Sequence, residues 1–330
     1  MLRCLLILSL SLISSLAFAD PLPSWNETHS KARIISFVES VTDPLSSDYV
    51  TPSDRIAVFD NDGTLWSEQP VYFQLIYAIE AFQKMAQDDP GMVTSDALKA
   101  AAAGDYKALA EAGEEAVIEV LEATHSGLSV DDFQASVNDW VATATHPVTG
   151  LRYDQMTYQP MVELLRYLRD EGFKTYIVSG GGIHFMRVFA EAAYGIPTEQ
   201  VIGTYTETSY EVIDSVPTII KQPAIGFVDD KEGKPINIDR IIGKRPIIAG
   251  GNSDGDYAMI EWTTAGEGPR FGLIVHHTDG EHEVAYACDS HIGRLCDGLE
   301  NGPNLGWLIV DMAKDWSRIY TGAQYPGEGP

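Results

Sequence analysis

Compact apolar runs alternate along most of the chain with longer stretches whose apolar residues recur at helical spacing. The compact runs have the composition of strands that are buried on both faces. They lie at residues 55–60, 174–178, 246–249 and 271–276. Helical spacing marks residues 30–42, 159–171 and 184–194. Strands that alternate with helices predict an α/β fold with a doubly wound, Rossmann-like parallel sheet.

Residues 67–155 have a different pattern, in which alanine, glutamate and leucine dominate and strand-like runs are few. Helical spacing here predicts helices at residues 70–88, 94–103, 105–125 and 129–145. The pattern then breaks at His146-Pro147. We therefore predict a helical domain at 67–155, inserted into an α/β core that is formed by residues 20–66 and 156–330.

The first 19 residues have the features of a secretory signal peptide. Arg3 precedes an apolar run that ends in Ala17-Phe18-Ala19, a small-x-small cleavage sequence. The run is shorter than the roughly 20 residues that a membrane-spanning helix needs, and no later stretch is apolar enough to span a bilayer. We predict a signal peptide at residues 1–19 and a mature protein that is periplasmic or secreted.

Two cysteines, Cys288 and Cys296, follow the predicted signal peptide and lie close together in sequence. In an oxidising compartment this spacing favours a short-loop disulfide. The alternative is a zinc site that also uses the histidines of this region, namely His276, His277, His282 and His291.

The chain is strongly acidic, with 22 lysines and arginines against 48 aspartates and glutamates and a net charge of −26. Such a surface repels nucleic acid and anionic membranes, so we expect neither as a partner. It also repels an anionic substrate. An anion site on this protein therefore needs a local source of positive charge, which a divalent metal ion would supply.

Asp60 and Asp62 stand one residue apart at the end of a predicted strand, in the sequence Asp60-Asn61-Asp62-Gly63-Thr64. Two such carboxylates are costly unless a cation neutralises them, and Mg²⁺ binds carboxylate and backbone oxygens. One carboxylate is then suited to attack phosphorus and the other to transfer protons. The alternative is a solvated turn, in which these residue types are common.

Three further polar segments follow predicted strands or precede helices. Residues 179–181 (Ser-Gly-Gly) offer a hydroxyl and free amides to an anion at a helix N-terminus. Either Lys231 or Lys234 is suited to pair with a nucleophile and a phosphate. Residues 252–256 (Asn-Ser-Asp-Gly-Asp) gather carboxylates as a metal site requires, although a helix N-cap is the alternative. Since ligands bind at the carboxyl ends of parallel strands, these segments are expected to form one site.

The order of these four segments resembles that of the haloacid dehalogenase (HAD) superfamily, over roughly residues 50–262. Asp60-x-Asp62-Gly63-Thr64-Leu65 is the most specific part of the likeness. The helical insert resembles the helical cap of that superfamily, and the likeness is closest to its phosphoserine phosphatase and phosphorylcholine phosphatase branch. The resemblance implies a magnesium-dependent phosphomonoesterase that acts through an aspartyl-phosphate intermediate. Dehalogenases of the superfamily lack the second aspartate, so Asp62 favours phosphoryl transfer.

The resemblance also implies roles for individual residues. Asp60 would be the nucleophile and a metal ligand, and Asp62 the general acid and base with its carbonyl on the metal. Lys234 would neutralise and orient, because Gly-Lys-Pro resembles the usual setting in the family, and Lys231 is the fallback. The residues implied in phosphate binding are Thr64, Ser179 and Gly180. Arg187, one turn into the helix after Ser179, is a further candidate to contact a phosphate or carboxylate, with a surface salt bridge as the alternative. The remaining metal positions fall on Asn252 and Asp256, with Asp254 as an alternative to Asn252.

Asn252 departs from the family pattern, which has an aspartate at this position. An asparagine oxygen can bind Mg²⁺ but brings no charge. The sequence therefore leaves the third protein ligand of the metal open.

Glu68 stands among Trp66, Tyr72 and Phe73 where the cap begins. An acidic residue among aromatics suits a cationic group, which suggests a small phosphorylated substrate such as phosphocholine or phosphoserine. The alternative is that the aromatics pack the cap onto the core. Two other functions stay open, namely phosphotransfer to an acceptor alcohol and non-catalytic binding of a phosphorylated ligand. Residues 277–330 lie beyond the motifs and have no predicted role.

Overall fold

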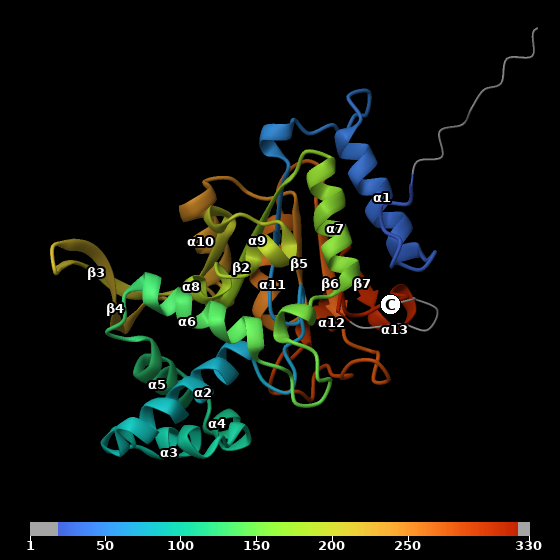
Figure 1. The fold of residues 1–330 in the computed structure, drawn as a ribbon. Coiled ribbons are helices and arrows are strands. Elements are labelled where there is room, and N and C mark those ends of the chain that lie inside the picture. The colour runs from blue at the N-terminus through green and yellow to red at the C-terminus, as the bar shows by residue number, and fades with distance from the viewer. Residues whose placement is uncertain (1–18, 323–330) are drawn as a thin grey trace, which may run out of the picture.

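The computed structural model describes residues 19–322. The predicted signal peptide, apart from its last residue, thus lies outside the described residues. Figure 1 shows a central sheet with helices packed against it and a group of helices, α2 to α5, that stands apart at one end. Among the described helices, none combines the length and the apolar character that crossing a bilayer requires.

Seven strands form the sheet, in the order β4-β3-β2-β1-β5-β6-β7. They are β1 (Ile56–Phe59), β2 (Lys174–Gly182), β3 (Val201–Ile213), β4 (Val216–Phe227), β5 (Ile248–Gly251), β6 (Phe271–His276) and β7 (Leu308–Asp311). Neighbouring strands are parallel except for β3 and β4, which form an antiparallel hairpin. The predicted fold class is confirmed, and all four predicted strands are present.

The apolar run of β1 is buried on both faces because alternate side chains enter two different cores. Ala57 and Phe59 belong to one core, and Ile56 and Val58 belong to the other. Helices α1 (His29–Thr42) and α7 (Gln159–Asp170) contribute to the first core, and α10 (Gly233–Ile242) and α11 (Tyr257–Thr264) contribute to the second. Helices on both faces make the sheet doubly wound, as predicted.

Five α-helices lie within residues 67–155, where a helical cap was predicted. They are α2 (Phe73–Asp88), α3 (Asp96–Ala103), α4 (Tyr106–Ala112), α5 (Glu114–His125) and α6 (Val130–Thr143). The single helix expected at 105–125 is interrupted at Gly113, whose φ of +85° does not belong to a helix. The helix expected at 184–194 is also divided, into α8 (Ile183–Met186) and α9 (Ala190–Tyr194). The boundaries of the inserted domain stay a prediction.

The hairpin of β3 and β4 was not predicted, because its exposed half mixes polar and apolar residues without a compact apolar run. It extends the sheet sideways (Figure 1). The backbone of Lys221 in β4 pairs with the loop between α5 and α6, through hydrogen bonds to Gly127 and Leu128. The hairpin therefore joins the sheet to the cap helices.

The C-terminal part of the chain adds β7, α12 (Asp297–Asn301) and α13 (Met312–Asp315) to the core. Between β6 and α12, Cys288 and Cys296 form a disulfide. The cysteine pairing predicted from the sequence is present. The two sulfurs are bonded to each other and are therefore not free to bind zinc. Among the described residues, no group of three or more histidine, cysteine, aspartate or glutamate side chains is arranged to hold a metal ion.

Candidate active site

The predicted motifs meet at the carboxyl ends of three neighbouring strands. Asp60 follows the central strand β1, Ser179 lies near the end of β2, and Asn252 follows β5. The Asp60 amide donates to the Gly250 carbonyl at 3.0 Å, which joins the first motif to the strand of the fourth. Lys234 reaches the same edge from the first turn of α10. The convergence expected from the order of the motifs is therefore observed.

Lys234 connects the first and fourth motifs. Its ammonium lies 2.7 Å from Asp60 Oδ1 and 2.5 Å from Asp256 Oδ1, and it donates to the Val178 carbonyl. Burial alone would lower the pKa of Lys234, but the charges of Asp256 and Asp60 outweigh it and raise that pKa. Lys231 is exposed and lies on the turn before α10. The structure thus places Lys234, and not Lys231, beside the predicted nucleophile.

The two aspartates of the first motif have unusual electrostatics. Burial and the nearby Asp256 carboxylate raise the pKa of Asp60, while Lys234 acts in the opposite direction. Burial also raises the pKa of Asp62, although its Oδ1 accepts a hydrogen bond from the Trp66 indole at 2.8 Å. Trp66 thus fixes the Asp62 side chain, and the raised pKa lets Asp62 hold a proton closer to neutral pH. Such a carboxyl group is suited to act as a general acid.

The second motif lies directly against the first. Ser179 is buried, and its hydroxyl accepts a hydrogen bond from the Gly181 amide at 3.1 Å. A methyl group added at Gly181 would lie 3.4 Å from both Asp62 Oδ2 and Ser179 Oγ. Gly180 faces Asp230, a partly buried carboxylate that the sequence analysis had not singled out as a site residue. The two loops are therefore in van der Waals contact range of each other at these glycines.

The acidic residues of the fourth motif have separate structural tasks. Asp256 Oδ2 accepts the amides of Asn252 and Ser253, each at 3.0 Å, and so closes the turn after β5. The Asp254 carboxylate accepts the amides of Cys296 and Gly298. Asp254 is therefore committed to the C-terminal segment, and Asn252 and Asp256 remain the motif's candidate ligands.

Asn252 is almost completely buried, and both ends of its amide are bonded. Its Oδ1 accepts from the Thr64 hydroxyl at 3.1 Å, and its Nδ2 donates to Glu68 Oε1 at 2.7 Å. A carboxylate accepts hydrogen bonds only, so it fixes which end of the amide faces it. Thr64 is fully buried and its hydroxyl orients Asn252, while its role in phosphate binding stays a prediction.

Glu68 was predicted to line an open substrate pocket, but it lies in the interior of the protein. Its side chain is buried, and Oε1 also accepts from the Tyr286 hydroxyl at 2.6 Å. Burial raises the pKa of Glu68 to about 8, against the effect of that hydrogen bond. Trp66 and Phe73 are buried as well. The Trp66 ring is stacked on the Phe189 ring, with 4.3 Å between the ring centres. These aromatics pack the cap onto the core, so the open acidic and aromatic pocket expected here is not formed.

Gly63 has a backbone conformation that the site requires. Its φ is +74°, in the left-handed region that glycine adopts without strain. A methyl group at this position would also overlap the side chains of Asn252 and Glu68. The absence of a side chain at Gly63 is therefore what lets these two groups approach the first motif.

The sequence analysis named His277 only as a candidate zinc ligand and did not single out Glu283. The His277 ring donates from Nε2 to the Gly63 carbonyl at 2.7 Å, and its Nδ1 lies 3.1 Å from Glu283. Burial would lower the pKa of His277, but the hydrogen bond and charge of Glu283 outweigh it and raise that pKa. Tyr158 and Ser67 both donate to the same glutamate. This network supports the backbone of the first motif. Because His277 and Gly63 are far apart in the chain, no local sequence pattern predicts that they meet.

Arg187 is not brought to the site. Its guanidinium donates from Nε to the Thr198 carbonyl at 3.0 Å, and burial lowers its pKa. Among the contacts of the described residues, none joins Arg187 to the phosphate-binding candidates.

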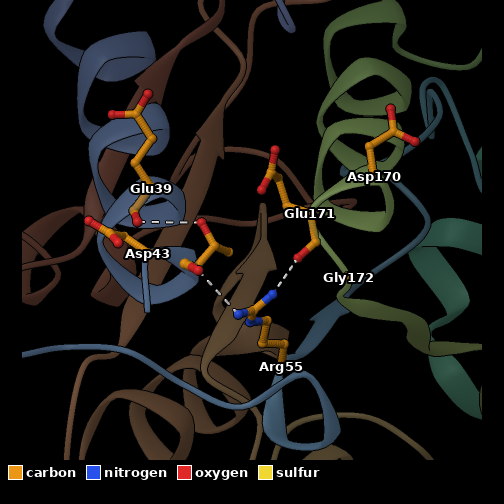
Figure 2. A pocket seen from close by; sticks show the side chains of 7 residues that line it. Glu39, Asp43, Arg55, Asp170, Glu171 and Gly172 are labelled. Carbon is orange, nitrogen blue, oxygen red and sulfur yellow. Dashed lines mark hydrogen bonds between the residues drawn. The ribbon is translucent and has the colours of Figure 1, made fainter. Parts of the chain in front are cut away.

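A depression of about 460 Å³ lies at the opposite end of the central strand, where β1 begins. Figure 2 shows Arg55 there, with Glu39, Asp43, Asp170 and Glu171 around it. The Arg55 guanidinium donates to backbone carbonyls, including that of Glu171 at 2.8 Å. Arg55 therefore ties three segments of the core together, at the end of the sheet where parallel α/β folds do not place their ligands.

A family model described as haloacid dehalogenase-like hydrolase matches residues 57–261, more than half of the chain. The chain belongs to the haloacid dehalogenase-like hydrolases. This match includes all four motifs and confirms the family predicted from them. No curated protein matches the sequence.

Several solved structures resemble this chain at low sequence identity. A functionally unknown protein from Anaerococcus prevotii is 15% identical, with a TM-score of 0.52 over 79% of this chain and 89% of that chain. A protein of unknown function from Bordetella pertussis is 17% identical, with a TM-score of 0.46 over 78% and 98%. A phosphoserine phosphohydrolase-like protein from Francisella tularensis is 16% identical, with a TM-score of 0.40 over 79% and 97%. The first of these likenesses supports the fold.

Proposed function

We propose that this haloacid dehalogenase-like hydrolase is an exported, magnesium-dependent phosphomonoesterase. The observation that carries the proposal is the buried Asp60 carboxylate at the end of the central strand. It is paired with Lys234 and lies near Asp62, which Trp66 orients. A paired and oriented carboxylate beside a second carboxyl group of raised pKa supports covalent catalysis on a phosphate ester.

The proposed reaction has two steps. An Asp60 oxygen forms a bond to phosphorus while the bond from phosphorus to the leaving alcohol breaks, and Asp62 gives its proton to that alcohol. In the second step, Asp62 takes a proton from a water molecule, whose oxygen attacks phosphorus and releases Asp60 and inorganic phosphate. Lys234 holds Asp60 Oδ1 throughout and so fixes the orientation of the nucleophile.

The donor set of the site suits Mg²⁺. Asp60 offers a carboxylate, Asp62 a backbone carbonyl and Asn252 an amide oxygen, and all three are hard oxygen ligands. Burial raises the pKa values of Asp60 and Asp62, which means that the protein alone does not neutralise them. When bound, Mg²⁺ would supply positive charge to these carboxylates and to the phosphate.

Burial raises the pKa of Glu68 to about 8, so without a cation the group is largely protonated near neutral pH. The positive charge of a bound Mg²⁺ would favour the carboxylate form and so let Glu68 supply the charge that Asn252 lacks. The Glu68 carboxylate accepts the Asn252 Nδ2 hydrogen at 2.7 Å, which polarises the amide and strengthens Oδ1 as a ligand. Glu68 is in turn oriented by Tyr286. A neutral ligand with a carboxylate directly behind it thus takes the place of the aspartate that the family usually has.

The substrate proposed is a small phosphorylated metabolite. The preference for a cationic ester, such as phosphocholine or phosphoserine, was based on Glu68 among aromatics. Glu68 is now bonded to Asn252 and Tyr286, so the support that remains for a cationic substrate is the net charge of −26.

Export is part of the proposal and has two supports. The sequence of residues 1–19 is typical of a secretory signal peptide. The disulfide between Cys288 and Cys296 suits an oxidising compartment such as the periplasm.

Hydrolysis of p-nitrophenyl phosphate tests the proposed function. We expect turnover with Mg²⁺ and its loss with EDTA. Release of inorganic phosphate identifies water as the acceptor, whereas a new phosphate ester in the presence of an added alcohol would indicate phosphotransfer. Binding of phosphate without turnover at any Mg²⁺ concentration would contradict the enzymatic proposal and favour a binding protein.

A further inference from the structure

A cavity of about 70 Å³ lies at a joint where the cap helices, the hairpin of β3 and β4, and the core meet. Three basic side chains are among the residues that line it: His125 at the end of α5, His184 in α8 and Lys221 in β4. One comes from the cap, one from the core and one from the hairpin. The joint therefore gathers three groups that can carry positive charge, and the proposed reaction uses none of them.

Lys221 and His184 are in direct contact at this joint. Lys221 is only 4% exposed, and its ammonium lies 3.2 Å from His184 Nδ1 and 3.2 Å from Thr206 Oγ1. Since an ammonium group can only donate, His184 Nδ1 must accept, and the single ring proton is then on Nε2. A second proton on Nδ1 would turn two donors and two positive charges toward each other. The contact therefore requires a neutral His184.

His125 is buried, and its two ring nitrogens have different partners. The Thr124 hydroxyl donates to the Val120 carbonyl at 2.8 Å, so its oxygen accepts from His125 Nδ1 at 2.7 Å. His125 Nε2 lies 3.4 Å from Gln74 Nε2. That amide nitrogen can only donate, and its orientation is fixed because Gln74 Oε1 accepts the Gly182 amide at 2.7 Å. His125 Nε2 therefore accepts, and this ring is neutral as well.

The electrostatics of the joint agree with this pattern of donors. Burial and the Lys221 charge lower the pKa of His125 to about 3. Burial, Lys221 and Arg187 lower the pKa of His184 to about 4. Burial also lowers the pKa of Lys221, to about 8, so the ammonium is still charged at the pH values where the histidines would take up protons. Lys221 thus opposes protonation of both rings.

The other groups around the rings do not compensate a proton. Of the described residues that line the cavity, Glu122 alone has a carboxylate, and no ion pair among the described residues joins it to any of the three basic groups. Tyr205 lines the cavity from β3, and Tyr77 packs edge to face with His125. The Phe133 ring lies 4.6 Å from the His125 ring. A proton taken up by either histidine is therefore left without a negative partner.

The same residues fasten the cap to the rest of the protein. The Gly127 amide donates to the Lys221 carbonyl at 2.8 Å, and the Lys221 amide donates to the Leu128 carbonyl at 2.9 Å. Gln74, in the first turn of α2, holds the amide of Gly182 at the end of β2. The joint therefore connects the cap helices to both the hairpin and the second motif.

We propose that this joint is an acid-sensitive latch, in which protonation of His125 or His184 releases the cap helices from the hairpin and from the second motif. In the closed joint both histidines have a pKa below the ordinary value of about 6.5, so an opened joint takes up protons. The stability of the closed joint is therefore fully present above about pH 6.5 and is lost as the pH falls toward the lowered values. Each histidine freed on opening raises the opening equilibrium constant up to about tenfold per pH unit over that range.

Nitrogen-15 NMR of the histidine rings in the wild type tests the contacts themselves. At about pH 5.5, where an ordinary histidine is mostly charged, we expect both rings to be neutral. The proton should be on Nε2 of His184 and on Nδ1 of His125, and His125→Gln and His184→Gln assign the signals. A charged ring, or the opposite tautomer of either histidine, would overturn the latch.

Hydrogen exchange of the Gly127 and Lys221 amides measures opening, because both amides donate across the joint. Relative to the intrinsic rate of an unfolded peptide, exchange in the wild type should quicken up to about tenfold per pH unit for each histidine freed, as the pH falls below about 6.5. The double variant His125→Gln/His184→Gln keeps an acceptor at each position but takes up no proton, so it should lose this pH dependence. His291→Gln changes an exposed histidine and should behave as the wild type does.

An equal pH dependence of exchange in the wild type and the double variant would contradict the proposal. Lys221→Met gives a second check, because removal of the facing charge should raise the pKa of His184 in an NMR titration. An unchanged titration would show that Lys221 does not hold this ring neutral. Circular dichroism checks that the variants are folded, and the two single glutamine variants replace the double variant if it is not. None of these measurements depends on turnover, so they test the latch separately from the proposed reaction.

Discussion

At the scale of single residues, the position of one carboxylate changes the picture of the metal site. Asn252 appeared to leave the site short of a negative charge, and Glu68 appeared to belong to the substrate pocket. The structure joins the two through one hydrogen bond of 2.7 Å. Charge at a metal site is set by what surrounds the ligands as well as by the ligands themselves.

Glu68→Gln is predicted to weaken Mg²⁺ binding about tenfold or more, as the loss of an outer-shell partner usually does. Titration calorimetry of the enzyme without substrate measures this directly. Glu115→Gln, which removes an exposed carboxylate from α5, is the matched control. Adding Asn252→Asp to Glu68→Gln returns the charge and should recover most of the affinity. Unchanged Mg²⁺ affinity in Glu68→Gln would show that this carboxylate does not serve the metal.

Asp60→Asn is predicted to abolish turnover while the protein stays folded. The amide keeps the shape of the side chain but cannot form the bond to phosphorus. The substitution also leaves Lys234 paired with Asp256, so the buried ammonium keeps an acidic partner. Steady-state assays with circular dichroism decide, and substantial residual activity in a folded variant would refute the assignment of the nucleophile.

At the scale of elements, the segment after β6 supports the catalytic loop. His277 bonds the Gly63 carbonyl, Tyr286 bonds Glu68, and the disulfide closes the same excursion. Gly293 approaches Glu68 so closely that a side chain at Gly293 would overlap it. Residues 277–296 therefore pack against the candidate site and support it, although they lie outside the four motifs.

The stability of the protein is predicted to depend on the charge of His277. Its pKa is raised in the folded state, so the stabilisation is complete below the ordinary pKa of histidine and is lost as pH rises through the raised value. The groups that face the ring are Glu283, Glu68, Tyr158 and Tyr286. Denaturation curves of the wild type between neutral and alkaline pH should show this loss.

His277→Gln should cost about 3 kcal/mol near neutral pH, because Glu283 is then left buried without its charged partner. The variant should also lose the part of the pH dependence that His277 causes. His291→Gln changes an exposed histidine of the same segment and serves as the control. A pH dependence that is equal in wild type and His277→Gln would contradict the role assigned to this imidazole.

At the scale of the whole molecule, the net charge of the chain and the charge of the candidate site are both negative. The chain carries a net charge of −26, and the buried edge of the sheet adds several carboxylates at one point. A protein with this distribution attracts cations and repels phosphate esters. Local cations, namely Lys234 and a metal ion, are therefore needed to admit a phosphate where the overall field opposes it.

Mg²⁺ is predicted to raise the melting temperature of the enzyme without substrate. A ligand that binds only the folded state adds about 2.7 kcal/mol of stability at a concentration of 100 times its Kd. Sodium chloride at equal ionic strength separates specific binding from general screening of the negative surface. An equal rise in both salts would contradict a specific site. The rise should shrink in Glu68→Gln and persist in Glu115→Gln.

The sequence by itself determined the fold class and most of the residues that meet at the candidate site. Buried parallel strands require apolar runs, and the chemistry of Asp60, Asp62 and Lys234 requires particular residues at strand ends, so both leave local signals. Tertiary structure decided what depends on contacts between distant segments. It placed Glu68 behind Asn252, His277 beneath Gly63 and Lys221 in the cavity of the cap, and it removed Arg187 from the site. Each of these contacts joins positions far apart in the chain, and the spacing of residues along one sequence carries no information about which distant side chains will meet.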